Sequence, residues 1–271
     1  MIGQEKIRKL IDGLERLPSF ILIVGDRGSG KKTVAEYISN KFLWTLYPTT
    51  GVSYTVPDVK IATIRDIITT SYRQITPMLY IVPDIDTMST EAQNSILKIT
   101  EEPPNRANFV MTVNDINNVL PTIKSRAYTI YMDRYTVQEL DEYLTSTGKH
   151  TNADDIVFDI CETPGEINTF LECGGKKFST FVDKVVDNLY SVTTANALKI
   201  LDSLDLKGEG KGYDVEIFLK LFARACLNQT DNNYIRAIFV TSLALTRLRV
   251  RGANKNMIMT NWILGVRELW N

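Results

Sequence analysis

The chain has 271 residues, with 31 basic and 32 acidic side chains, a formal net charge of -1 and 44% apolar residues. This composition is typical of a folded globular protein and excludes a disordered chain, a collagen-like repeat and a strongly basic nucleic-acid coat. A single histidine, His150, and three scattered cysteines exclude a histidine-rich metal site and a four-cysteine zinc site.

The first half alternates segments that predict strands with segments that predict helices. Short apolar runs predict strands at 20–24, 59–62, 79–82, 109–113 and 128–132. Helical spacing and capping predict helices over 7–17, 34–42, 64–75 and from Ser89 to about residue 102. Because strands and helices alternate, we expect an α/β domain built on a parallel five-stranded sheet.

After residue 133 the strand patterns largely disappear. Helical spacing predicts helices over 137–144, 154–161, 164–171, 176–189, 193–204, 213–228, 233–249 and 256–270. We therefore expect an α/β domain over 1–133, a small helical domain over 134–186 and an all-α C-terminal domain over 187–271. The apolar stretches are too short to span a bilayer and no signal peptide is evident, so the chain is expected to be cytoplasmic, with no membrane partner.

A glycine-rich loop follows the first predicted strand and opens a helix, which is the context that a phosphate-binding loop requires. Its candidate nucleotide-binding residues are Gly25, Gly28, Ser29, Gly30, Lys31, Lys32 and Thr33. The glycines allow backbone N–H groups to surround phosphate oxygens, and Lys31 would reach the β- and γ-phosphates. Lys32 stands where a serine or threonine would hold magnesium, and an ammonium cannot coordinate a cation. ATP is therefore a possible ligand and magnesium an uncertain one; the alternative is a glycine-rich turn with incidental lysines.

The acid motif of an ATPase is also altered. The strand at 79–82 is followed by Pro83-Asp84-Ile85-Asp86, where an ATPase would carry Asp-Glu. In one register Pro83 replaces the metal-organising aspartate and Asp84 replaces the glutamate. In the other, Asp84 is the first acid and Ile85 fills the glutamate position. Both registers disfavour hydrolysis, and Asp86 is either a capping or a structural residue.

Three further segments resemble those of a known protein family. With the phosphate loop, they occur in the family's order and together cover about residues 1–133. Ser89–Pro104 resembles the clamp-loader helix "AQNALLKTLEEPP", Leu120–Ala127 resembles "LPTIxSRC", and Ile2–Glu5 resembles "IGQ". The chain thus resembles the clamp-loader family of AAA+ proteins, and its altered motifs most resemble the delta-prime subunits of bacterial DNA polymerase III.

The resemblance implies an AAA+ ATPase-like domain, a helical lid and a helical collar. It implies a pentameric ring with other clamp-loader subunits, which opens a sliding clamp and places it on primer–template DNA. It implies that Arg126 is an arginine finger that enters a neighbouring subunit's ATP site, and that Asn114 is a polar sensor. Hydrolysing relatives often carry an arginine near Glu166, whose carboxylate is expected to repel phosphate. Residues 43–56 lack the cysteines of the relatives' zinc module, so we expect no zinc.

The sequence therefore predicts a delta-prime-like subunit that is poor or inactive in ATP hydrolysis and acts through Arg126. An active ATPase subunit of a clamp loader remains an alternative, as does a related AAA+ replication adaptor such as a helicase loader. DNA contact would occur through the assembled complex. The available cations are expected mostly to form a solvated face; they are Lys60, Arg65, Arg73, Lys98 and Arg106.

Overall fold

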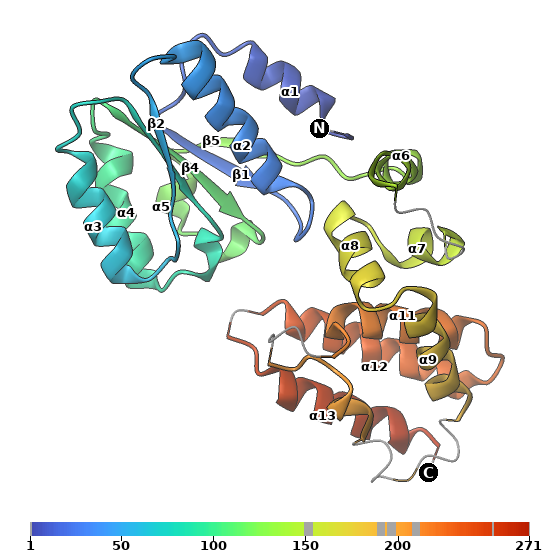
Figure 1. The fold of residues 1–271 in the computed structure, drawn as a ribbon. Helices are drawn as coiled ribbons and strands as arrows, with labels where there is room; N and C mark the ends of the chain where they lie inside the picture. Colours follow the sequence, from blue (N-terminus) through green and yellow to red (C-terminus); the bar gives the residue numbers. More distant parts are fainter. Residues whose placement is uncertain are drawn as a thin grey trace. The chain divides into compact units, whose positions relative to one another are not determined.

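The computed structural model describes residues 2–148, 154–188, 193, 199–207, 212–250 and 252–270. The chain forms two compact units, Met1–Tyr143 and Leu144–Asn271, each with its own fold (Figure 1). His150 lies outside the described residues, as does part of the helix predicted over 193–204.

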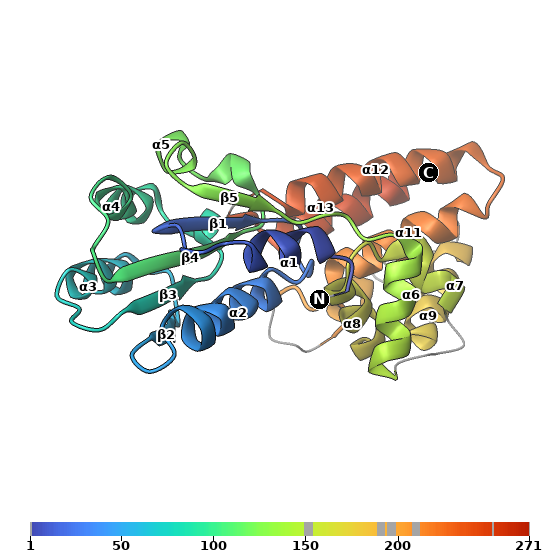
Figure 2. The ribbon, with the colours of Figure 1, turned by 90° about the horizontal axis from the view of Figure 1, so that it is seen from above.

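The first unit is a parallel five-stranded sheet with helices on both faces, in the strand order β2-β3-β4-β1-β5 (Figure 2). The strands are β1 (Phe20–Val24), β2 (Val52–Thr55), β3 (Met78–Val82), β4 (Ala107–Val113) and β5 (Tyr128–Tyr131). The helices are α1 (Glu5–Asp12), α2 (Lys31–Lys41), η1 (Phe42–Leu46), α3 (Ile61–Ser71), η2 (Ile85–Thr87), α4 (Thr90–Glu101), η3 (Ile116–Asn118) and α5 (Pro121–Lys124). The predicted α/β class and parallel sheet are confirmed.

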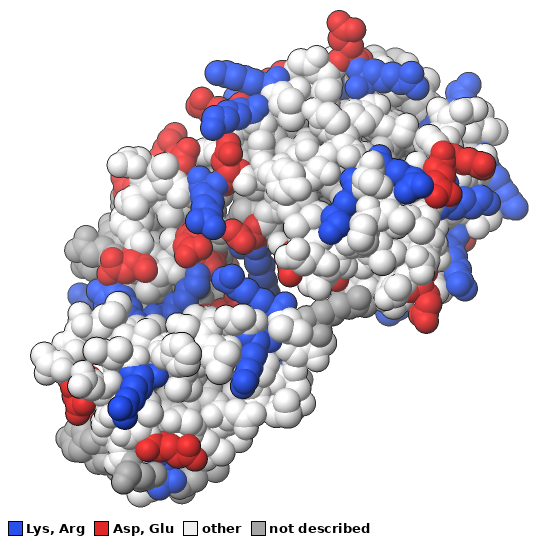
Figure 3. All heavy atoms as spheres, turned by 180° about the vertical axis from the view of Figure 1, so that it is seen from behind, with Lys and Arg blue, Asp and Glu red and all other residues white. Residues whose placement is uncertain are grey.

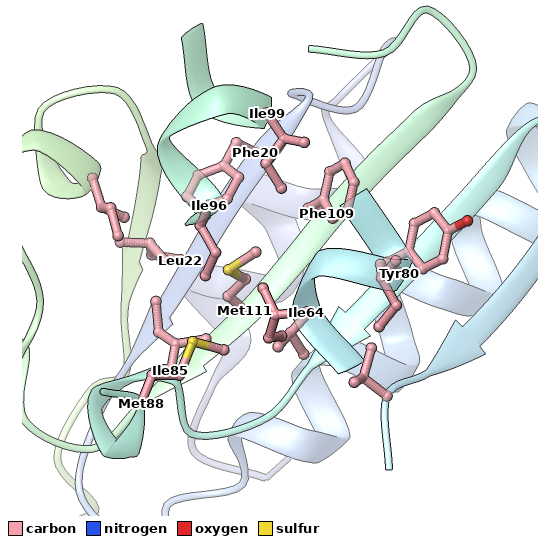
Figure 4. Packing of buried hydrophobic residues seen from close by; sticks show 14 of the residues in the cluster. Phe20, Leu22, Ile64, Tyr80, Ile85, Met88, Ile96, Ile99, Phe109 and Met111 are labelled. Atoms are coloured by element: carbon pink, nitrogen blue, oxygen red, sulfur yellow. The ribbon is translucent and has the colours of Figure 1, made fainter. Parts of the chain in front are cut away.

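The central strand β1 is apolar at every position because both of its faces are covered. All five residues of β1 are buried. Phe20 and Leu22 pack with α3, α4 and α5, as Figure 4 shows for several members of this cluster. Ile21 and Ile23 pack with α1 and α2 in a second cluster. Alternate residues of one strand thus contribute to two separate cores.

The second strand was predicted at the wrong place. We expected a strand at 59–62, but the strand is β2, and residues 61 and 62 belong to α3. β2 is the edge strand, and most of its side chains are exposed, so it lacks the apolar run of the central strands. Ile61 begins an amphipathic helix that buries Ile64 and Ile67. The first helix is also shorter than the predicted 7–17, since Gly13 caps it.

The second unit is helical in all of its described elements except for one isolated β-bridge between Leu204 and Tyr213. Its helices are α7 (Asp154–Ile160), α8 (Pro164–Glu172), α9 (Lys176–Asp187), α11 (Val215–Leu227), α12 (Asn232–Leu248) and α13 (Lys255–Glu268), while α6 (Val137–Thr147) crosses from the first unit. Helix α11 packs on α7, α8, α9 and α12. The division into lid and collar at residue 186 stays a prediction. Among the helices that the structure describes, none is long and apolar enough to cross a membrane.

The core of the helical unit is built around Trp262 of α13. Its ring meets Phe218 and Phe222 of α11 edge to face, with ring centroids 5.6 Å and 4.9 Å away. Its buried indole N–H donates to the Thr241 hydroxyl of α12 over 3.0 Å, and that hydroxyl donates to the Ala237 carbonyl. One polar contact thus orients the largest side chain of the core.

We expect Thr241→Val to destabilise the protein by about 1–3 kcal/mol, because it leaves the buried indole N–H of Trp262 without an acceptor. Urea denaturation followed by tryptophan fluorescence measures this loss. Ser242→Ala, at the exposed neighbouring position, is the matched control and should change stability by less than about 0.5 kcal/mol. Equal stability of the two variants would contradict the role given to the hydroxyl.

Candidate functional site

Three strands deliver the predicted nucleotide-site residues to one edge of the sheet. Val24 of β1 pairs with Val113 of β4, and Val82 of β3 pairs with Met111. Because these strands are parallel, the residues that follow them meet at the same edge, called here the carboxyl edge. The phosphate loop, Asp84 and Asn114 lie there.

The phosphate loop has the backbone that its sequence predicts. Gly28 and Gly30 have φ angles of +79° and +90°, which are conformations that favour glycine. Gly30 is the N-cap residue of α2, so the loop leads directly into a helix N-terminus. Such a terminus presents free backbone N–H groups and a partial positive charge, which suit an anion.

The Lys31 ammonium is folded back onto its own loop. It donates to the carbonyl oxygens of Gly25 and Asp26 over 2.8 Å and 2.7 Å, and the residue is buried. Burial lowers the pKa of this ammonium, while the carboxylates of Asp84 and Asp86 act to raise it. The structure therefore brings the lysine of the loop near the acids that follow β3.

Tyr135, which the sequence analysis missed, packs against the loop from the segment after β5. Its hydroxyl donates to the Ser29 carbonyl over 2.8 Å. Ser29 itself is buried, and its Oγ has no hydrogen-bond partner. A Cβ added to Gly25 would lie 2.6 Å from the Met132 side chain, so a larger residue here would require Met132 to move. The loop is thus closely packed, and the buried Ser29 hydroxyl has no hydrogen-bond partner within the protein.

Lys32 and Thr33 both face solvent at the start of α2. The Lys32 ammonium lies 4.0 Å from the Glu36 carboxylate, an exposed pair one helical turn apart. The Lys32 side chain therefore lies on the exposed surface of the helix.

Asp84 and Asn114, which the sequence marked separately, contact each other at the ends of β3 and β4. The Asn114 side-chain amide donates to Asp84 Oδ1 over 3.0 Å. Asp84 has a φ of +46°, unusual for a residue other than glycine, and its backbone N–H donates to the Thr112 hydroxyl over 2.9 Å. Thr112 and Asn114 therefore hold Asp84 in a strained conformation at the carboxyl edge.

Asp86 is a structural residue in this arrangement. Its buried carboxylate accepts backbone N–H bonds from Asn114 over 3.1 Å and from Asp115 over 3.2 Å. These bonds tie the turn after β3 to the end of β4. Of the two readings for this acid, the structural one is confirmed.

Arg126 lies at the opposite edge of the sheet, two residues before β5 begins. Tyr128, the first residue of β5, pairs with Ile21 of β1. Ile21 precedes Gly25, the first residue of the phosphate loop, by four residues, which is about 13 Å at the usual rise of a parallel strand. The Arg126 guanidinium lies 3.2 Å from the Glu101 carboxylate and donates to the Thr122 carbonyl. The structure therefore separates Arg126 from the other candidate residues and gives it a half-exposed acidic partner.

Two buried glutamines, Gln4 and Gln93, form side-chain hydrogen bonds with backbone groups that are far away in the sequence. The Gln93 amide of α4 donates to the Asn118 carbonyl and accepts from the Leu120 N–H, over 2.8 Å and 2.9 Å. The Gln4 amide makes the same pair of bonds with the backbone of Asp133. Both residues stand in the segments that carry the family resemblance, and this is the sequence signal that could have identified them. Gln93 thereby fixes the turn that leads to α5 and Arg126.

Glu166 is paired within the helical unit. Its carboxylate lies 2.6 Å from the Lys220 ammonium of α11 and also accepts the backbone N–H of Glu162. The charge of Glu166 is therefore balanced locally, which weakens the expected repulsion of a phosphate.

The described part of the chain holds no metal-binding cluster, and the face drawn in Figure 3 shows no large basic surface. No group of three or more His, Cys, Asp or Glu residues there could hold a metal ion. On the face drawn in Figure 3, blue and red side chains are interspersed over the described residues. The absence of zinc and the route of DNA contact stay predictions.

Comparisons with known proteins point to DNA polymerase III. A family model described as "DNA polymerase III, delta subunit" matches residues 48–136, which include the acid motif, α4 and Arg126. The chain is 22% identical to the gamma subunit of DNA polymerase III from Buchnera aphidicola over 230 residues, or 74% of this chain and 56% of that protein. It is 25% identical to the gamma/tau subunit from Mycoplasma genitalium over 174 residues, or 55% of this chain and 29% of that protein. The chain thus spans about half of one relative and under a third of the other.

The fold is also similar to that of a solved structure. The crystal structure of a DNA polymerase III gamma subunit-related protein from Thermotoga maritima matches with a TM-score of 0.54 and 16% identity, over 99% of this chain and 100% of that chain. At this identity the likeness concerns the fold alone, a part with a parallel sheet followed by a helical part.

We expect Asp86→Ala to destabilise the sheet unit by about 1–3 kcal/mol, because it leaves two partly buried backbone N–H groups without their carboxylate acceptor. Asp86→Asn should fall between this variant and the wild type, since it keeps one acceptor oxygen. Thermal and urea denaturation measure both. Asp66→Ala removes an exposed carboxylate from α3 and is the control. If Asp66→Ala reduced stability as much as Asp86→Ala, the change in net charge would explain the loss of stability, and the hydrogen bonds of Asp86 would not.

Proposed function

Since the chain belongs to the clamp-loader family of AAA+ proteins, we propose that it is a delta-prime-like subunit that supplies Arg126 to the ATP site of a neighbouring subunit. In this proposal it works in the cytoplasm as part of a pentameric ring that loads a sliding clamp on primer–template DNA. Residues 1–133 form the ATPase-like part, 134–186 the lid and 187–271 the collar.

The position of Arg126 carries the proposal. It lies at the edge of the sheet opposite its own phosphate loop, so it is poorly placed to contact a phosphate held there. Its partner Glu101 has a side chain that is 54% exposed, and the arginine itself is 38% exposed. Exposed ion pairs of this kind contribute about 0–1 kcal/mol, so the guanidinium can exchange the carboxylate for a phosphate at small cost. A guanidinium beside a γ-phosphate stabilises the charge that develops there during transfer.

The carboxyl edge supports binding of a nucleotide better than its hydrolysis. The loop offers backbone N–H groups, Lys31 and the unpaired Ser29 Oγ, which fit the phosphates of ATP. The positions that would organise magnesium do not fit it, because Lys32 is a cation and Pro83 has no carboxylate. Bound ATP would supply a triphosphate for these residues to hold, and Asp84 and Asn114 would face it. We infer that any ATP hydrolysis by this chain itself is weak or absent.

An active ATPase subunit remains the second candidate, and Lys31 with its intact glycines favours it. An ATPase assay of the purified chain with ATP and magnesium distinguishes the active subunit from the inactive one. We expect no phosphate release above that of Lys31→Ala, because the metal-organising residues are missing. Turnover that Lys31→Ala abolishes would favour the active subunit instead.

The trans role of Arg126 is tested in the reconstituted clamp loader. We expect Arg126→Ala to reduce DNA-stimulated ATPase activity while the complex still assembles; arginine fingers contribute about 10³–10⁵-fold at the site that they serve. Arg126→Lys should also lose activity, because an ammonium lacks the planar fork of a guanidinium.

Glu101→Gln is the matched control for this test. It removes the ion pair and leaves the arginine, so the ATPase activity should stay at the wild-type level. If Glu101→Gln lost as much as Arg126→Ala, the pair would be structural and the arginine-finger role would be rejected.

A further inference from the structure

The peptide between Ser29 and Gly30 in the phosphate loop is anchored by a residue outside the loop. Its carbonyl accepts a hydrogen bond of 2.8 Å from the Tyr135 hydroxyl. The Ser29 side chain does not share this task, because its buried Oγ has no hydrogen-bond partner. The Tyr135 hydroxyl also lies 3.4 Å from the point that a Cβ of Gly30 would occupy, so it approaches the loop closely at this peptide.

The hydrogen bond to this carbonyl also fixes the direction of the next N–H group. The peptide is trans and planar, so its N–H, which belongs to Gly30, points away from the tyrosine. Gly30 is the N-cap residue of α2, and its N–H adjoins the free N–H groups at the start of that helix. A set of backbone N–H groups at a helix N-terminus suits the oxygens of a phosphate. One donor of the candidate phosphate site is thus oriented by a tyrosine from another segment.

The chain around Tyr135 is fixed on both sides, which suits it to hold this orientation. Two residues before it, the Asp133 backbone makes two hydrogen bonds with the Gln4 side chain, over 2.9 Å and 3.1 Å. Directly after it, the Glu139 carboxylate accepts the Thr136 N–H over 2.7 Å, and the Thr136 hydroxyl accepts the Glu139 N–H over 3.3 Å. This reciprocal pair caps the start of α6. The hydroxyl is therefore in place before a ligand arrives, which reduces the ordering that binding would require.

The ring of Tyr135 packs against the N-terminal segment. Gly3 has a φ angle of +69°, and a Cβ at this residue would lie 2.8 Å from two carbon atoms of the ring. The missing side chain at Gly3 thus leaves the room that the ring occupies beside the loop. Burial raises the pKa of the Tyr135 hydroxyl, so this group is protonated at neutral pH and donates its hydrogen.

We propose that Tyr135 is a positioning residue for phosphate, which acts through the Ser29 carbonyl to turn the Gly30 N–H toward the triphosphate of a bound nucleotide. The inference rests on the proposed function, in which the loop holds ATP. It deepens that function by naming a residue outside the loop on which the affinity for phosphate depends. Because Tyr135 acts on the phosphate site, its effect is the same for a triphosphate with a base and for one without.

The test measures the binding of ATP and of inorganic tripolyphosphate to the purified full chain by calorimetry. Tyr135→Phe keeps the ring and removes the hydroxyl. We expect it to weaken the binding of both ligands by the same factor, about two- to tenfold, which is the range for the loss of one hydrogen bond. Tyr131→Phe, at a tyrosine of β5 that is 62% exposed, is the matched control and should bind both ligands as the wild type does.

Gly3→Ala moves the same ring by a different route. The added methyl group should displace the ring from the loop and weaken the binding of both ligands. In a chain that already carries Tyr135→Phe, there is no hydroxyl to displace, so Gly3→Ala should cause no further loss of affinity. An equal loss in both backgrounds would mean that Gly3→Ala acts without the hydroxyl, and it would overturn the proposal.

The remaining outcomes separate the roles that Tyr135 could have. If Tyr135→Phe lowers the melting temperature and leaves both affinities unchanged, the residue is structural and the proposal is rejected. If ATP alone is bound, or if the binding of ATP alone is weakened, the base carries the affinity and the proposal is overturned. If the wild-type chain binds neither ligand, phosphate binding is rejected here and in the proposed function, whereas the test of Arg126 in the reconstituted clamp loader is unaffected.

Discussion

Burial of the central strands on both faces is the constraint on which the first unit depends. Every residue of β1 must be apolar, because successive side chains enter two different cores. Polar and charged groups are therefore displaced to the two ends of the strands. The phosphate loop, Asp84 and Asn114 collect at one end, and Arg126 with Glu101 at the other. The separation between the candidate nucleotide-binding ends of the strands and the ends near Arg126 follows from this packing.

Much of this arrangement could be predicted from the sequence because it depends on local patterns. The apolar runs of β1, β3 and β4, the serine cap of α4 and the glycines of the phosphate loop each leave a signal within a few residues. The edge strand β2 was missed because exposure removes the apolar run that identifies a strand. Val59 and its neighbours formed such a run by coincidence, since the apolar residues there begin the amphipathic helix α3.

The contacts that hold the site together could not be predicted in the same way. Asp86 binds backbone N–H groups 28 and 29 residues away, and Gln93 binds groups 25 and 27 residues away. Backbone groups are the same at every residue, so no sequence pattern identifies these partners. Lys220 likewise gives no sign in the sequence that it neutralises Glu166. Such side chains become recognisable only when the fold brings distant segments together.

The two hydrogen bonds of Gln93 have a mechanical consequence. A single hydrogen bond would fix the distance between α4 and the turn but leave their relative orientation free. Two hydrogen bonds from one planar amide fix the distance and the orientation. Helix α4 and the turn at Asn118–Leu120 are therefore joined as a rigid body, and α5 follows that turn directly. The Glu101–Arg126 pair at the far end of the same helix is exposed and adds little to this connection. We expect a displacement of α4 to move the turn before α5 with it, because both hydrogen bonds of Gln93 would otherwise break.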